Sequence, residues 1–144
     1  MDSVSDKVTF AFEHLKSDVD QPEEGWELLL RITADFSVLI NGRMFYSEVA
    51  FPVVEFAARA ALWLKDGGDL SYESMDSQEK PLLTFFRGGD GKFRPYSPHQ
   101  EFQMADYIDE NALRQAIVEF RARLCREAMT ALDLNVTPVI GELG

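Results

Sequence analysis

The sequence predicts an α+β fold in which a single-layer antiparallel sheet carries two packed helices. Runs of alternating apolar and polar residues are short and are separated by turn residues. Two longer segments have apolar residues at helical spacing, and most strands lack the crossover helix that parallel pairing needs. We expect the order β-β-β-α-β-β-β-β-α in one domain over residues 1–144, with irregular ends at about 1–6 and 134–144.

Three strands are expected first. Lys7 to Leu15 alternates and places three apolar side chains on one face, and the longest alternation runs from Trp26 to Ile40. Asn41-Gly42 follows, a pair that tolerates the positive φ angles of a tight hairpin turn. With Arg43 to Val49 as the return strand, the pattern predicts a three-stranded meander.

A helix is expected next, over Phe51 to Lys65, because Pro52 suits a first helical turn and Gly67-Gly68 can end the helix. A longer helix is expected over Asp109 to Leu132. Four short strands are predicted between the helices, with a hairpin turn at Gly88 to Gly91. These strands are Asp69–Met75, Leu82–Arg87, Lys92–Tyr96 and roughly Glu101–Tyr107.

Composition limits the compartment and the covalent chemistry. The chain begins without a basic and apolar leader, and no apolar run approaches the roughly 18 residues of a membrane span. Cys125 is the single cysteine, so an internal disulfide framework is excluded. We expect a cytoplasmic protein.

The net charge is −11 and the excess is uneven: residues 1–80 hold 16 acidic and 7 basic side chains. Such a surface repels nucleic acid and anionic membranes and attracts basic proteins. We therefore expect a basic protein partner, no nucleic acid and no membrane. The alternative is that the acidity serves solubility alone.

Two acidic segments are the candidate partner-binding surface. The first lies between the first two expected strands, and the second follows the first expected helix. Their acidic residues are Asp18, Asp20, Glu23, Glu24, Asp66, Asp69, Glu73, Asp76 and Glu79.

No pattern for phosphate binding is complete. Gly88 to Lys92 is glycine-rich, but a P-loop needs Lys and Ser or Thr opening a helix after its second glycine. Phe93, Arg94 and Pro95 follow here, and Pro95 cannot extend such a helix. The segment predicts a turn.

The remaining chemistry-bearing residues are scattered. His14 continues the apolar face of the first expected strand, which predicts a partly buried structural residue, and His99 lies in a loop. Cys125 is expected to pack beside the apolar stripe of the last helix. We therefore expect no catalytic residue, cofactor or metal site built on His, Cys, Ser or a P-loop. Chemistry based on carboxylates alone stays open.

Arg114 and Arg121 fall on one flank of the last helix and Arg123 on the other. This spacing fits a phosphate clamp or, as we expect, a boundary where long side chains cover apolar surface.

Several segments resemble a known group of sequences. They are Asn41-Gly42, Phe51 to Ala57, Trp63-Leu64, Tyr72-x-Ser74, Leu82 to Phe85 and Tyr96-Ser97. Over roughly residues 26 to 125 they resemble small, acidic, uncharacterised bacterial proteins, some of which look like immunity proteins of polymorphic-toxin systems. The resemblance implies a bacterial origin and a binding role.

The leading hypothesis is a non-catalytic inhibitor or immunity protein that neutralises a basic partner such as a toxin nuclease. A structural or regulatory homodimeric domain is the second hypothesis, and a small carboxylate-dependent enzyme is the third.

Overall fold

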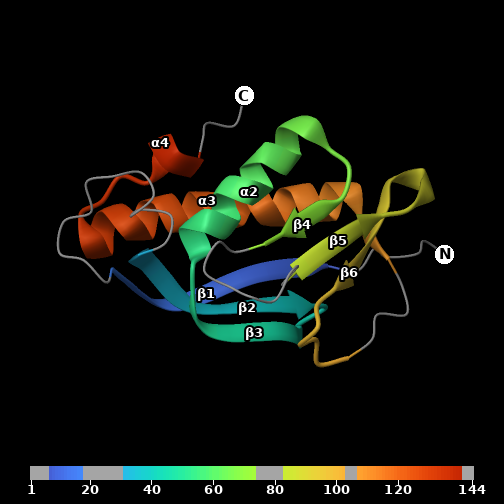
Figure 1. Cartoon of the computed structure of the whole chain (residues 1–144), viewed down its shortest axis with the longest axis horizontal. Helices are drawn as coiled ribbons and strands as arrows, with labels where there is room; N and C mark the ends of the chain where they lie inside the picture. Colours follow the sequence, from blue (N-terminus) through green and yellow to red (C-terminus); the bar gives the residue numbers. More distant parts are fainter. Residues whose placement is uncertain (1–6, 18–30, 74–82, 103–106, 141–144) are drawn as a thin grey trace.

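The computed structural model of the chain describes residues 7–17, 31–73, 83–102 and 107–140 (Figure 1). It confirms the α+β class and the order of strands and helices. The strands, however, form two antiparallel sheets instead of the single sheet expected. Sheet A has the order β1-β2-β3 and sheet B the order β4-β5-β6-β7.

Sheet A is the expected meander, with β1 (Val8–Ser17), β2 (Ile32–Ile40) and β3 (Arg43–Phe51). Asn41 and Gly42 have φ angles of 54° and 81°, so the turn between β2 and β3 is the tight hairpin predicted. The second strand begins at Ile32 and not at Trp26, since Arg31 has helical geometry. The other residues of that expected extension lie outside the described ranges.

In the sequence, helix α2 (Val53–Asp66) lies between the strands of sheet A and those of sheet B. It begins after Pro52 and ends at Gly67, whose φ is 73°. A helix of 14 residues is about 21 Å long. The strands that follow it, β4 to β7, pair with one another and not with sheet A.

Sheet B is built from β4 (Leu70–Tyr72), β5 (Leu83–Arg87), β6 (Lys92–Tyr96) and β7 (Ile108–Asp109). The short 3-10 helix η1 (Gly89–Gly91) forms the turn between β5 and β6.

The strand expected at Glu101–Tyr107 is wrong where the structure describes it. Glu101 and Phe102 lie in a bend, and residues 103–106 are outside the described ranges. The backbone N–H of Glu101 donates to the carbonyl of Phe45 in β3 at 2.8 Å. This segment therefore follows the edge of sheet A, and only the two residues of β7 join sheet B.

Helix α3 (Glu110–Leu132) is followed by the short helix α4 (Thr137–Ile140). An irregular tail was expected from residue 134, but Val136 and Ile140 are buried and fix this turn of helix against the core. Among the described residues, no helix is long and apolar enough to cross a membrane.

The core is rich in aromatic rings. Phe36 of β2 stacks on Phe51 with ring centroids 4.3 Å apart. It also meets Phe10 of β1, Phe56 of α2 and Phe120 of α3. One cluster of buried hydrophobic residues joins both sheets and the helices. The even-numbered residues of β2, and those of β1 up to Phe12, face this core, so the odd-numbered residues in these stretches belong to the outer face of sheet A.

Three strand edges are occupied by polar groups. Arg123 of α3 donates to the carbonyl of Phe12 in β1 at 2.7 Å, and Arg59 of α2 donates to the carbonyl of Ser71 in β4 at 3.0 Å. The N–H of Glu101 serves the edge of β3 in the same way. These contacts satisfy backbone groups that a further strand would otherwise bind.

Candidate functional site

The acidic residues selected from the sequence are only partly visible. Asp66 and Glu73 are exposed, at the end of α2 and just after β4. Asp69 is exposed and its Oδ1 accepts the backbone N–H of Arg87 at 2.7 Å, which links the start of β4 to the end of β5. The other six lie outside the described residues: Asp18, Asp20, Glu23, Glu24, Asp76 and Glu79.

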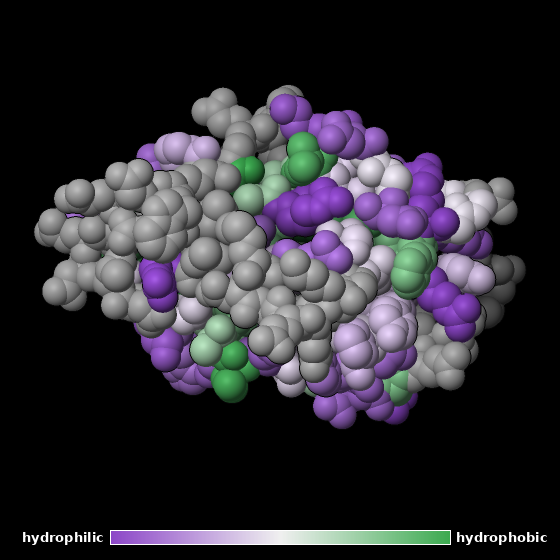
Figure 2. Space-filling view, viewed as in Figure 1, coloured by the Kyte–Doolittle hydropathy of each residue, from purple (hydrophilic) through white to green (hydrophobic). Residues whose placement is uncertain are grey.

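Charge is divided unequally between the described and the remaining residues. The described ranges contain 14 of the 25 acidic and 13 of the 14 basic residues, a net charge of −1 out of −11. On the face seen in Figure 2, hydrophobic residues form small separate patches among hydrophilic ones. A functional surface on the described part must therefore be found from local geometry, because its total charge is nearly zero.

Asp35 lies between two irregularities in the strand pairing of sheet A. It is on β2 and belongs to the outer face of sheet A. The register shifts between Glu13 and Lys16 where β1 pairs with β2, and between Ala34 and Phe36 where β2 pairs with β3. Asp35 is therefore flanked by a β-bulge in each neighbouring strand. Bulges commonly redirect a side chain at a functional site.

Each bulge contains a non-glycine residue in the left-handed region. His14 of β1 has a φ of 58°, and Ala50 of β3 has a φ of 52°. This conformation costs an ordinary L-residue roughly 1–2 kcal/mol. Strained residues of this kind persist where the surrounding structure imposes them, often at functional sites.

Both strained residues bind the same carboxylate. His14 Nδ1 is 2.8 Å from Asp35 Oδ2, and the backbone N–H of Ala50 donates to the Asp35 carboxylate. The hydrogen bond and the charge of Asp35 raise the pKa of His14, and the hydrogen bond from His14, together with that from Ala50, lowers the pKa of Asp35. Asp35 is thus held ionised and in a fixed orientation.

The expectation that His14 is partly buried is wrong, because its side chain is 75% exposed. Strict alternation would place residue 14 on the core face with Phe10 and Phe12. The bulge and the left-handed backbone of His14 instead turn its side chain to the outer face, toward Asp35.

Two more side chains complete this surface, which we name the Asp35 site: Glu13, His14, Thr33 and Asp35. Glu13 lies directly opposite Asp35 in the register of β1 and β2. Thr33 is two residues from Asp35 on β2. It is only 7% exposed, and its Oγ1 has no hydrogen-bond partner among the described residues. The exposed groups of the site are two carboxylates, which suit a cationic ligand.

A family comparison covers most of this structure. The model of one family, described as a domain of unknown function (DUF7878), matches residues 8–129. The chain belongs to this family. No curated protein and no solved structure matches the chain significantly. The DUF7878 range includes both bulges, the whole Asp35 site and all four strands of sheet B.

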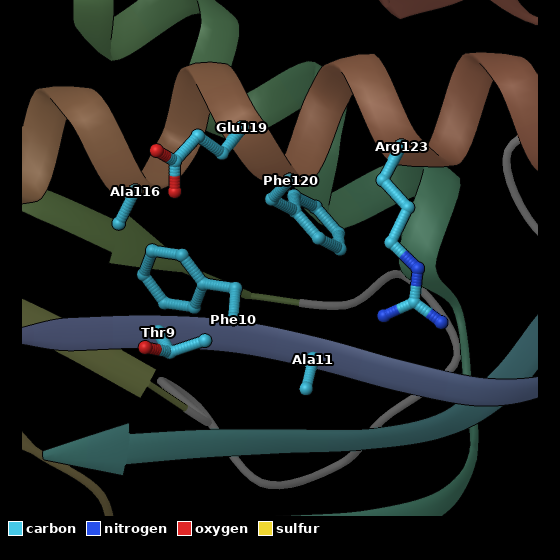
Figure 3. A pocket seen from close by; sticks show the side chains of 7 residues that line it. All are labelled: Thr9, Phe10, Ala11, Ala116, Glu119, Phe120 and Arg123. Carbon is cyan, nitrogen blue, oxygen red and sulfur yellow. The ribbon is translucent and has the colours of Figure 1, made fainter. Parts of the chain in front are cut away.

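A pocket of about 200 Å³ also lies within the DUF7878 range, between β1 and α3 (Figure 3). Phe10 and Phe120 face each other across it with ring centroids 6.0 Å apart, and Glu119 and Arg123 lie at its rim. Sites for small molecules usually enclose roughly 300–1,000 Å³. Arg123 is already bound to the Phe12 carbonyl and to Glu127, so we interpret the pocket as a packing gap.

The arginines of α3 that were compared with a phosphate clamp have structural contacts. Arg114 lies over the ring of Trp63 and donates to the carbonyl of Leu64 at 3.0 Å. Arg123 lies over the ring of Phe12. These contacts confirm the expected boundary role for Arg114 and Arg123, and Cys125 packs at half-buried depth as expected. Among the described residues, no group of three or more His, Cys, Asp or Glu side chains is placed to hold a metal ion.

Proposed function

We propose that the protein is a non-catalytic binding protein that holds a basic protein partner. In the leading form of this proposal it is an inhibitor or immunity protein, and its partner is a toxin such as a nuclease. The observation that supports a cation-binding surface is the Asp35 site, where two strained bulges hold one ionised carboxylate in place.

The neighbouring charges favour a cationic ligand. Like charges directly opposite each other on adjacent strands are destabilising, and Glu13 faces Asp35 in this way. His14 compensates only one side of the Asp35 carboxylate, which remains 45% exposed. A lysine or arginine of a partner would bind both carboxylates through charge-assisted hydrogen bonds.

The acidic segments would act at longer range. Residues outside the described ranges contain 11 acidic and one basic side chain. A negative field of this kind accelerates association with a basic protein and weakens as salt is added. The cationic cleft of a nuclease is the kind of surface that such a protein can occupy.

The exposure of the Asp35 site supports binding over catalysis. A general base works best in a site that excludes water, and the His14 side chain is 75% exposed on an open sheet face. A protein interface needs no such enclosure before its partner arrives.

The proposal is tested by capture from an extract of the native host. The immobilised protein should retain a basic protein at about 50 mM salt and release it at about 500 mM, because exposed charges are screened at high ionic strength. The captured partner is then titrated against purified variants. Glu13→Gln with Asp35→Asn should weaken its affinity at least about tenfold.

Asp133→Asn is the matched control, because it removes an exposed charge at the end of α3, outside sheet A, and asparagine tolerates the left-handed backbone of residue 133. Its affinity should equal that of the unchanged protein. If no basic protein is captured at low salt, or if light scattering shows a stable homodimer as the sole complex, the proposal is wrong.

A further inference from the structure

The outer face of sheet B has a chemistry opposite to that of the Asp35 site. Three aromatic residues there are about half exposed: Phe86 at 46%, Tyr96 at 45% and Tyr107 at 49%. Their strand neighbours Phe85, Phe93 and Ile108 are buried on the inner face. The exposed rings are therefore not needed to fill the core.

The strand register brings these rings together around one arginine. Arg94 of β6 is directly opposite Phe86 of β5, and Tyr96 is the next residue on the same face of β6. The rings of Phe86 and Tyr96 are 6.3 Å apart. Tyr107 precedes the paired residue Ile108, and its ring edge lies beside Gly88 at the turn end of β5.

Arg94 differs from three other arginines of the described structure. Arg59 and Arg123 donate to backbone carbonyls, and Arg87 forms an ion pair with Glu110 at 3.1 Å. Arg94 is exposed, and its side chain forms no hydrogen bond or ion pair with any described residue. An unpartnered guanidinium between exposed aromatic rings has the composition of an interaction hot spot.

We propose that this face, formed by Phe86, Lys92, Arg94, Tyr96 and Tyr107, docks a protein segment in which one carboxylate is flanked by apolar side chains. The guanidinium of Arg94 can receive a carboxylate in a bidentate pair, and the rings on either side can pack against the apolar neighbours. Lys92 lies two residues away on the same face, opposite Asp109 of β7.

The charge of the face favours a single carboxylate over a nucleic acid. A nucleic acid presents a phosphate at every nucleotide and needs a row of cations. Here Lys92 is opposite Asp109, which leaves Arg94 as the cation without a neighbouring acid in the register. The net charge of −11 further opposes a polyanion but tolerates one local carboxylate.

The size of the face predicts a modest affinity. Three half-exposed rings bury far less than the roughly 800 Å² that each partner contributes to a standard interface. A short linear segment bound with a dissociation constant in about the micromolar range is expected.

The test is a selection of random linear peptides displayed on phage against the purified protein. Enriched peptides should contain Asp or Glu beside Leu, Phe or Trp. Measured by fluorescence anisotropy, Arg94→Glu should weaken their binding at least about tenfold, and Phe86→Ala with Tyr96→Ala by a similar factor. Arg126→Glu, at an exposed position of α3, is the matched control and should leave the affinity unchanged.

Exchanging the charges of the peptide and of residue 94 distinguishes the loss of a direct contact from a change in folding of the variant. A peptide whose acid is replaced by Lys should bind the Arg94→Glu variant more tightly than it binds the unchanged protein. Enriched peptides without an acid, or equal losses in the Arg94 and Arg126 variants, would overturn the proposal. Tighter, Arg94-dependent binding of an oligothymidylate would replace it with a nucleic-acid site. None of these outcomes depends on the Asp35 site or its partner.

Discussion

Sheet A and sheet B use the same antiparallel pairing but leave different outer faces. The strands of sheet A have 9 or 10 residues, and its outer face is polar, with Asp35 held by two bulges. The strands of sheet B have 2 to 5 residues, and its outer face is aromatic and basic, with Arg94 at its centre. The net charge of −11 for the whole chain therefore does not indicate the chemistry of either outer face.

The difference shows how one small fold can separate stability from recognition. Both sheets bury an aromatic inner face, since Phe36, Phe85 and Phe93 are all at most 1% exposed. Neither outer face is required for that core. Each face can therefore carry its own charge, and partners of opposite sign become possible on one chain.

The largest expected effect is on the free energy of unfolding. It tests whether an inner aromatic residue stabilises the fold while an outer one does not. Phe36→Ala in sheet A should destabilise the protein by about 3–5 kcal/mol, because it leaves a cavity among the rings of Phe10, Phe51, Phe56 and Phe120. Phe86→Ala in sheet B should cost less than about 1 kcal/mol, since the ring is half exposed. Urea denaturation of both variants measures the two free energies of unfolding.

A comparable loss in both variants would break the comparison. It would mean that the outer face of sheet B contributes to the stability of the fold and is not reserved for a partner.

An intermediate effect is expected at the bulges, which distinguish sheet A. Ala50→Gly should raise stability by about 0.5–1 kcal/mol, because glycine removes the left-handed strain and loses part of that gain to its greater unfolded-state entropy. The backbone N–H that binds Asp35 is retained. Ala122→Gly, at an exposed position inside α3, should lower stability by about 0.5–1 kcal/mol. Thermal unfolding of both proteins should shift their midpoints in opposite directions.

The smallest effect concerns protonation at the Asp35 site. The folded pKa of His14 is above its ordinary 6.5 and that of Asp35 is below its ordinary 3.8. The stabilisation associated with His14 is present below pH 6.5 and is lost as pH rises through its folded pKa. The stabilisation associated with Asp35 is present above pH 3.8 and is lost as pH falls through its folded pKa.

NMR titration of the two histidines should therefore show a raised pKa for His14, and Asp35→Asn should return it toward 6.5. An unchanged His14 titration in the variant would show that the pair does not persist in solution.

Local patterns predicted the elements of the fold better than their assembly. The hairpin at Asn41-Gly42 and the two long helices were predictable because turn residues and helical spacing act over short distances. The division into two sheets depends on the position to which α2 leads the chain and on the hydrogen bond between Glu101 and Phe45. These two residues are 56 positions apart in the sequence. Such long-range pairing leaves no periodic signal near either residue.

The Asp35 site was missed for a related reason. Alternation carries His14 to the inner face, and only the bulge reverses that placement. In the sequence, His14 and Asp35 each lie in an expected strand. The pattern gives no pairing register for these strands, so it does not show that the two side chains meet. For sheet B, alternation could group Phe86 apart from Phe85 but could not tell that the Phe86 ring stays about half exposed.

The guanidinium groups at the sheet edges have a consequence for assembly. Arg59 and Arg123 occupy carbonyls of β4 and β1 from within the same chain. A strand from another molecule would first have to displace these bonds, so templated growth of a sheet across molecules is opposed during folding and at high concentration. These bonds oppose the aggregation that open strand edges invite, and they leave the outer faces of both sheets unused by the edge contacts.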